Sequence, residues 1–163
     1  MTQPHRLWDL AQRIVDKAGA EGLMIATAES CTGGMIAAAI TDVPGASAVL
    51  DRGFVTYSNE AKAEMLGVAR ALIARHGAVS GPVARAMAAG ALARSRADIA
   101  VSVTGVAGPG GGTPQKPVGL VWFGLAARGA PVRLERRVFA DSDRGRVRTR
   151  ATETALALLL NAL

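Results

Sequence analysis

Residues 27–34, with the sequence TAESCTGG, constrain the fold more than any other part of this chain. An apolar run over residues 23–26 stops abruptly at small hydroxylated residues, and two glycines then lead into a second apolar run over residues 35–40. This order predicts a strand, a sharp turn and a helix, with Ser30 and Cys31 at the turn. Such a turn exposes a side chain at the carboxyl end of a strand and directs free N–H groups of the next helix toward a ligand.

The rest of the chain alternates between helical and strand patterns. Apolar residues at helical spacing, bounded by glycine and proline, predict helices over residues 4–20, 33–41, 59–66, 70–75, 83–96 and 144–161. Short apolar runs predict strands over residues 23–28, 53–57, 99–103, 118–126 and 132–139. We expect Asn59 to cap the third helix, and Ser142 or Asp143 to cap the last.

The order of these elements predicts how they pack. No helix separates the strands at residues 99–103 and 118–126, so these two should form an antiparallel hairpin. Helices precede and follow the strands, partly in β-α-β order. We therefore expect a three-layer α/β/α sandwich with a mixed, mostly parallel five-stranded sheet, formed by residues 1–163 as a single domain.

Charge and composition narrow the class of partner. The formal net charge is +6 and the pI about 10.7, which would suit nucleic acid or a phosphorylated small ligand. Only 4% of residues are aromatic, whereas proteins that bind single strands stack bases on aromatic rings. We therefore favour a small ligand, with most arginines as solvated surface.

The sequence also indicates a compartment. A single cysteine cannot form an internal disulfide, which fits a reducing cytosol. The N-terminus has no signal-peptide core, and no apolar stretch approaches the roughly 20 residues that span a bilayer. We expect a cytoplasmic protein without membrane contact.

Two nucleophiles compete at the turn. The Ser30 hydroxyl needs a neighbouring base, without which it would simply be a helix cap. A Cys31 nucleophile would usually need histidine, but the only two histidines, His5 and His76, lie far from the motif in sequence. We therefore interpret Cys31 as a small apolar filler beneath the turn.

A second constellation supplies a base for Ser30. Residues 57–62, with the sequence YSNEAK, leave a strand and enter a helix, and Tyr57 is the only tyrosine. Lys62 would lie in the first helical turn, where the helix dipole and burial favour a neutral amine. A lysine that extends along the surface into solvent is the alternative that spacing alone leaves open.

Glycines and arginines near the C-terminal half could bind an anion. The loop over residues 104–119 is rich in glycine, which lets backbone N–H groups approach a phosphate or carboxylate, although a flexible hairpin connection is an equal alternative. It does not match a P-loop. Arg144 and Arg148 lie four residues apart at the start of the last helix, and so on one face.

Taken together, these motifs resemble the CinA C-terminal domain family. The resemblance is carried by AESCTGG at residues 28–34, RGFVTYSNEAK at residues 52–62, HGAVS at residues 76–80, and GVAGP to KPVG at residues 105–119, and it extends over nearly the whole chain. It implies a three-layer fold, and nicotinamide-nucleotide amidohydrolase activity without a metal or cofactor. Larger CinA proteins carry an additional N-terminal nucleotide-processing domain, and we expect any pyrophosphatase activity of that domain to be absent here.

Mapped onto this sequence, the resemblance implies Ser30 as nucleophile, with Tyr57 and Lys62 relaying its proton. We expect N–H groups around Thr32, Gly33 and Gly34 to form the oxyanion hole. The residues expected to hold ribose and phosphate are Thr104, Gly105, Gly108, Gly111, Gly112, Arg144 and Arg148.

Two further expectations follow from the resemblance. The substrate would be nicotinamide mononucleotide, and the protein would be a homo-oligomer, most simply a dimer. The alternative function is a non-catalytic nucleotide- or phosphate-binding module linked to competence or the DNA-damage response. That alternative accounts for the glycine loop and the arginines, but not for Tyr57 and Lys62 near the serine turn.

Overall fold

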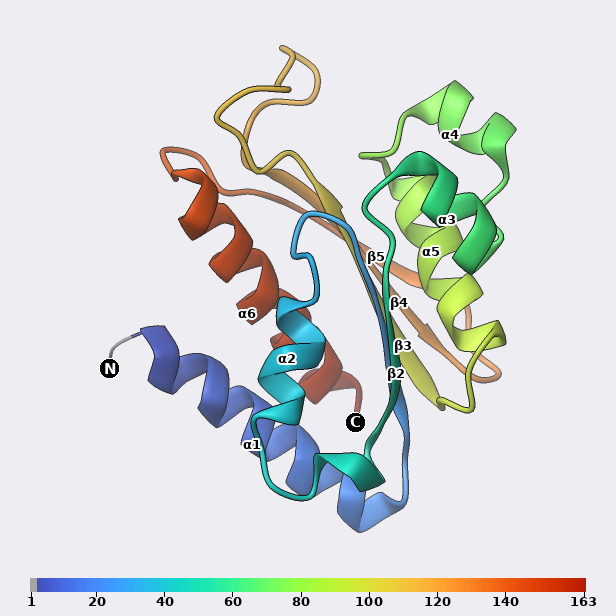
Figure 1. The fold of residues 1–163 in the computed structure, drawn as a ribbon, viewed down its shortest axis with the longest axis vertical. Helices are drawn as coiled ribbons and strands as arrows, with labels where there is room; N and C mark the ends of the chain where they lie inside the picture. Colours follow the sequence, from blue (N-terminus) through green and yellow to red (C-terminus); the bar gives the residue numbers. More distant parts are fainter. Residues whose placement is uncertain (1–2) are drawn as a thin grey trace.

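The computed structural model describes residues 3–163 and contains one five-stranded sheet with helices on both faces (Figure 1). The strands are β1 (Ile25–Glu29), β2 (Leu50–Val55), β3 (Ile99–Gly105), β4 (Leu120–Ala127) and β5 (Arg133–Val138). The helices are α1 (Gln3–Glu21), α2 (Met35–Thr41), the 3-10 turn η1 (Ala46–Ala48), α3 (Asn59–Leu66), α4 (Arg70–His76), α5 (Gly81–Ala93) and α6 (Arg144–Ala162). The mixed, five-stranded α/β architecture expected from the sequence is confirmed.

The expectation of a mostly parallel sheet is wrong. The strand order is β2-β1-β3-β4-β5, in which β1 pairs in parallel with β2 and β3, while β3–β4 and β4–β5 are antiparallel. Parallel neighbours need a crossover of a dozen or more residues, usually a helix. The glycine loop and a tight turn provide the last two connections without helices, so these strands reverse direction.

The two faces of the sheet carry different helices. Figure 1 shows α1, α2 and α6 on one side, and α3, α4 and α5 on the other. Each side has its own apolar cluster, the first containing Ile36, Phe123 and Leu156, and the second Leu66 and Met87. Every residue of β1 is buried, because β1 lies inside the sheet with both faces covered.

The helix caps only partly match the sequence-based expectations. Ser58, not Asn59, caps α3, because its Oγ accepts a hydrogen bond from the Ala61 N–H at 3.0 Å. Asn59 is instead the first residue of the helix. Of the two candidates for α6, Asp143 is the cap, and its Oδ1 accepts from the Arg146 N–H at 2.8 Å.

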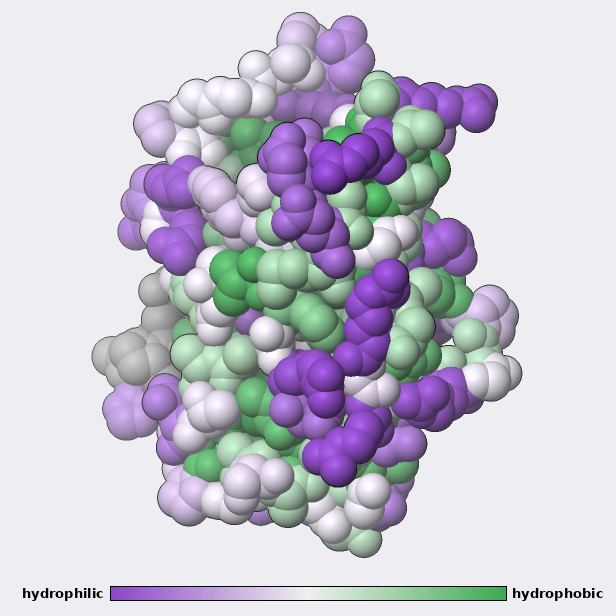
Figure 2. Space-filling model, turned by 45° about the vertical axis from the view of Figure 1, so that its right-hand side comes forward, coloured by the Kyte–Doolittle hydropathy of each residue, from purple (hydrophilic) through white to green (hydrophobic). Residues whose placement is uncertain are grey.

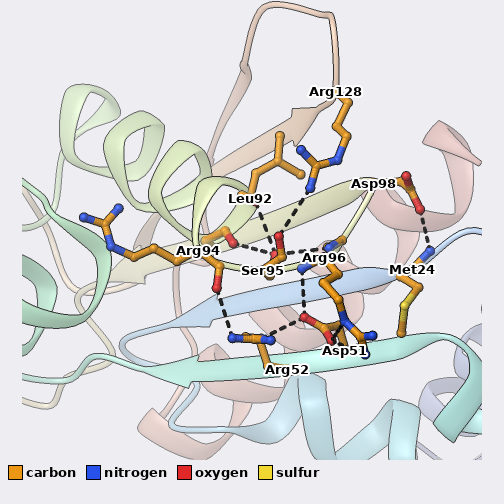
Figure 3. Close-up of polar contacts among 11 residues, drawn as sticks. Met24, Asp51, Arg52, Leu92, Arg94, Ser95, Arg96, Asp98 and Arg128 are labelled. Carbon is orange, nitrogen blue, oxygen red and sulfur yellow. Dashed lines mark hydrogen bonds and ion pairs between the residues drawn. The ribbon is translucent and has the colours of Figure 1, made fainter.

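A polar network lies at the amino ends of β1, β2 and β3 (Figure 3). The buried Asp51 carboxylate accepts hydrogen bonds from the Arg96 N–H at 3.0 Å and from Arg52 Nε at 2.7 Å. The Arg96 N–H and the two arginine side chains lower the pKa of Asp51. Asp98 accepts from the Met24 N–H at 2.9 Å in the same region. Structural contacts thus occupy the end of the sheet where these strands begin, so we expect a ligand site at the end where β1 and β2 finish.

On the face seen in Figure 2, hydrophilic side chains project between small apolar areas. Arg148 is half-buried, and every other arginine is exposed. Within residues 3–163, no helix combines the length and the apolar character needed to cross a bilayer.

Candidate active site

Ser30 and Lys62 meet at the carboxyl ends of β1 and β2. Ser30 directly follows β1, and Lys62 lies in α3, the helix that follows β2. Because β1 and β2 are parallel neighbours, their carboxyl ends lie at one sheet edge. Lys62 Nζ lies 3.1 Å from Ser30 Oγ, within hydrogen-bond distance. The sheet topology therefore brings together two residues that are 32 positions apart.

The Lys62 amine is enclosed by protein. The residue is only 1% exposed, and besides Ser30 its Nζ contacts the carbonyl oxygens of Thr56 at 3.0 Å and Tyr57 at 3.2 Å. Burial lowers the pKa of Lys62 from its ordinary value, because the charged form loses hydration. The alternative of a surface lysine is thus excluded by the structure, and burial shifts the equilibrium of this amine toward its neutral form.

Tyr57 lies at the mouth of the site. Its side chain is among the exposed large hydrophobic groups, with 64% of the residue accessible. Arg144 Nη2 donates to the Tyr57 hydroxyl at 3.4 Å, and within residues 3–163 this is the only hydrogen bond of that hydroxyl. The structure therefore brings Lys62 to Ser30, but it places the phenol beside Arg144.

Cys31 is poorly suited to be a nucleophile. It is buried, and burial raises the pKa of its thiol to about 12, although its own N–H and Arg148 act in the opposite direction. The thiolate, which is the reactive form, is thus almost absent at neutral pH.

The turn after Ser30 differs from the sequence-based expectation. Helix α2 begins at Met35 rather than Gly33, because Gly33 and Gly34 have φ values of 59° and 103°, in the left-handed region that favours glycine. The Gly33 N–H donates to the Ser30 carbonyl at 3.0 Å, so it is engaged within the turn. Of the three expected oxyanion donors, the Gly33 N–H is therefore engaged, whereas those of Thr32 and Gly34 donate to no acceptor within residues 3–163.

A buried carboxylate occupies the first turn of α2. Glu29 is fully buried at the end of β1, and its oxygens accept from the N–H groups of Ile36 at 2.9 Å and Ala37 at 3.1 Å. Thr27 Oγ1 donates to the same carboxylate at 3.3 Å. These helix amides are thus satisfied by Glu29 and cannot also face a substrate.

A cavity of about 270 Å³ opens beside Ser30 and Lys62. It is lined by Ser30, Cys31, Tyr57, Asn59, Lys62, Ala78, Val79, Thr104, Gly105, Ala107 and Arg144. Two larger hollows border α1 and α6, but their lining residues include no buried nucleophile with a base beside it. Within residues 3–163, no group of three or more His, Cys, Asp or Glu side chains gathers as metal ligands would.

The residues expected to bind ribose and phosphate separate into two sets. Thr104, Gly105 and Arg144 line the cavity, and Arg144 Nη1 donates to the Gly108 carbonyl at 2.8 Å, which ties the glycine loop to α6. Gly111 and Gly112 are exposed on the loop and are not among the lining residues.

Two other expected binding residues, Arg148 and Thr32, are not among the residues that line the cavity. Arg148 donates to the carbonyls of Cys31 and Thr32, and it does not line the cavity. Thr32 is fully buried, and its hydroxyl has no hydrogen-bond partner within the described chain.

Sequence reasoning did not find every residue of the site. Glu29 could have been suspected, since a carboxylate at the end of a buried strand, directly before the serine, needs a partner. Ala78, Val79 and Ala107 carry no chemical signal in the sequence, because they only shape the wall of the cavity.

Comparison with known proteins identifies the family. The model of the CinA C-terminal domain matches residues 8–163. The chain belongs to the CinA C-terminal domain family. A relative from Escherichia coli K12, called nicotinamide-nucleotide amidohydrolase PncC, is 53% identical over 94% of this chain and 92% of its own length.

Other CinA relatives are longer than this chain. A CinA-like protein from Akkermansia muciniphila is 54% identical over 94% of this chain, but the match covers only 37% of that protein. A solved structure, the competence/damage inducible protein CihA from Agrobacterium tumefaciens, is 51% identical with a TM-score of 0.93, covering 96% of both chains. The fold described above is thus the CinA C-terminal fold.

Proposed function

We propose that this chain is a nicotinamide-nucleotide amidohydrolase, which converts nicotinamide mononucleotide and water to nicotinate mononucleotide and ammonia. The observation that carries the proposal is the contact of 3.1 Å between the buried Lys62 amine and the Ser30 hydroxyl. The Escherichia coli relative named for this activity matches nearly the full length of both chains, which supports the choice of substrate. We further propose that residues 1–163 act as one amidohydrolase domain, since the family match spans residues 8–163.

The hydrogen bonds of Lys62 support it as the general base. The carbonyl oxygens of Thr56 and Tyr57 can only accept hydrogen bonds. A neutral amine has two N–H groups and one lone pair, so donation to both carbonyls leaves the lone pair for the Ser30 hydroxyl. In the neutral form that we propose, Ser30 donates its proton to Nζ, whereas in the charged form Nζ donates to Ser30 Oγ. The contact of Lys62 with Ser30, which the Tyr57 hydroxyl lacks, favours Lys62 over a tyrosinate as the base, an alternative that the sequence left open.

The reaction then proceeds in two halves. Ser30 Oγ bonds to the carboxamide carbon while its proton passes to Lys62 Nζ; the C–N bond then breaks, and the Lys62 proton goes to the leaving nitrogen as ammonia forms. A water molecule attacks the resulting ester and gives a proton to Lys62. The bond between the acyl carbon and Oγ breaks, and the proton returns to Ser30. General-base assistance of this kind contributes about 10²–10⁴-fold to the rate.

The cavity suits the pyridine amide, with the rest of the nucleotide toward solvent. Its volume of about 270 Å³ is slightly below the roughly 300–1,000 Å³ of typical small-molecule sites. The exposed Tyr57 ring and the Arg144 guanidinium stand at its mouth. We propose that Arg144 pairs with the phosphate, because a guanidinium matches phosphate geometry with two parallel hydrogen bonds.

An ammonia assay with nicotinamide mononucleotide tests the proposal. We expect wild-type protein to release ammonia and Ser30→Ala to release none, with the thermal midpoints of both proteins similar. Calorimetry on the same samples should show that Ser30→Ala still binds the mononucleotide. Binding without ammonia release by the wild type would refute hydrolysis and favour a binding module. Near-native release by Ser30→Ala would refute the serine mechanism.

Self-association remains a prediction from the family resemblance. One copy of the chain contains all of the residues proposed for the reaction. Light scattering coupled to size-exclusion chromatography measures the mass directly, and a monomer at working concentration would contradict the expected dimer.

A further inference from the structure

Arg148 donates hydrogen bonds to the turn that carries the nucleophile. It lies on α6, and its Nε donates to the Cys31 carbonyl at 3.0 Å and its Nη2 to the Thr32 carbonyl at 3.4 Å. These partners are 117 and 116 positions away in the chain. Arg148 is also the one arginine of the described chain that is not exposed. Its charge is therefore directed at two peptide groups of the turn and not at solvent.

The Thr32 carbonyl, one of the two that Arg148 contacts, begins a chain of hydrogen bonds. In a trans peptide the C=O and N–H groups point in opposite directions. The Thr32 carbonyl, which Arg148 contacts, shares its peptide group with the Gly33 N–H, and that N–H donates to the Ser30 carbonyl at 3.0 Å. The Ser30 carbonyl in turn shares its peptide group with the Cys31 N–H. Two peptide groups, joined by the hydrogen bond from Gly33 to Ser30, thus link the guanidinium to the Cys31 N–H.

The Cys31 N–H belongs to the residue that directly follows the nucleophile in the chain. No hydrogen bond from it to an oxygen acceptor occurs within residues 3–163, and Cys31 lines the cavity beside Ser30. The N–H groups of Gly33, Ile36 and Ala37 are engaged, whereas those of Thr32 and Gly34, like that of Cys31, donate to no oxygen acceptor within residues 3–163. A backbone N–H of the residue after a nucleophilic serine is well placed to meet the oxyanion that forms on its substrate.

We propose that Arg148 is a positioning residue that orients and polarises the Cys31 N–H as an oxyanion donor. This inference rests on the proposed serine mechanism. The guanidinium fixes the turn by holding two of its carbonyls, and it draws electron density along the chain of peptide groups, because linked hydrogen bonds strengthen one another. The last N–H then carries more positive charge where the negative charge develops in the transition state.

Kinetics of Arg148→Met and Arg148→Lys test the proposal, with Arg146→Met as the matched control. Arg146 lies on the same helix, is exposed, and has only a loose ion pair with Asp143 at 3.9 Å. We expect Arg148→Met to lose about 10–100-fold in kcat, since small misplacements of catalytic groups have effects of this order. KM should change by less than about threefold. Arg148→Lys should lose less, because an ammonium keeps the charge but not the two-pronged contact.

A second amide separates positioning from phosphate binding. Nicotinamide riboside has the same carboxamide but no phosphate. If Arg148 acts on the turn, the fractional loss in kcat/KM will be equal for the riboside and the mononucleotide. A loss confined to the mononucleotide, expressed in KM, would overturn the proposal and assign Arg148 to the phosphate.

A serine-directed probe tests the inference independently of the substrate. In labelling by a fluorophosphonate, Ser30 Oγ bonds to phosphorus, fluoride leaves, and the serine proton passes to Lys62. Intact-mass measurement should show labelling at least about tenfold slower in Arg148→Met, by loss of oxyanion support. The pH midpoint of labelling should remain that of wild type, because Lys62 sets it.

The outcomes are distinct. Labelling of the wild type without ammonia release would refute the proposed function while leaving the Arg148 test intact. Wild-type protein that does not label would overturn both. Labelling of Arg148→Met at the wild-type rate would overturn the role of Arg148 alone. If Arg148→Met does not fold, a wild-type labelling rate and a wild-type kcat in Arg148→Lys would likewise overturn the role of Arg148.

Discussion

Replacement of Lys62 by methionine tests the central feature of the site. Methionine keeps the length and apolar stem of the side chain but removes the amine that contacts Ser30 at 3.1 Å. Removal of a general base costs about 10²–10⁴-fold in rate, which corresponds to about 3–5 kcal/mol of transition-state stabilisation. We therefore expect kcat/KM for ammonia release to fall at least about 100-fold in Lys62→Met.

The pH dependence provides a second, independent readout. Burial lowers the pKa of Lys62, and the neutral amine is the active base, so wild-type kcat/KM should rise with pH through this lowered pKa. The residual activity of Lys62→Met should lack that rise. Lys62→Arg is the matched control, because a guanidinium stays charged over the whole range and should also fail as a base.

Stability should depend on the same group with a defined sign. Because the Lys62 pKa is lower in the folded protein, the unfolded chain binds more protons between the folded pKa and about 10.4. The free energy of unfolding of the wild type, relative to Lys62→Met, should therefore rise with pH across that window. Urea titrations at several pH values measure it. Near-native turnover in Lys62→Met, or an unchanged pH profile, would refute the assignment of Lys62 as base.

Three further predictions concern the surroundings of the pair. Cys31→Ala should keep ammonia release within about twofold of wild type, because a thiol whose pKa is raised to about 12 supplies no thiolate; a tenfold loss in the same assay would contradict this. The loss of activity in Tyr57→Phe should be smaller than that in Lys62→Met by a factor of at least about ten, because the Tyr57 hydroxyl contacts Arg144 and not Ser30. Equal losses in the two variants would show that Tyr57 takes part in the proton relay. Asp51→Asn should destabilise the fold by about 1–3 kcal/mol at pH 7 in urea unfolding. Its pKa is lowered in the folded state, so this difference should shrink as the pH falls below about 4, and a constant difference would contradict the linkage.

Local sequence signals predicted much of the fold because they act over a few residues. The glycine pair at residues 33 and 34, the aspartate cap of α6, and the hairpin connections depend on hydrogen-bonding patterns that a short segment already determines. Two of the errors were also local. The sequence predicted Asn59 as the cap of α3, but Ser58 is the cap. Helix α2 begins at Met35, two residues after the predicted start, because glycines with positive φ cannot start a helix.

The sequence by itself determined a serine turn, a separate tyrosine and lysine segment, and an α/β chain with short reversals. Only the tertiary structure decided what these pieces do to one another. Parallel pairing of β1 and β2 placed the amine on the serine, and packing of α6 behind the turn brought in Arg148 from more than 100 residues away. Burial, and hence the lowered pKa of Lys62 and the raised pKa of Cys31, exists only when both faces of the sheet are covered. Desolvation depends on all the atoms around a group, whatever their distance along the chain, and no local pattern contains that information.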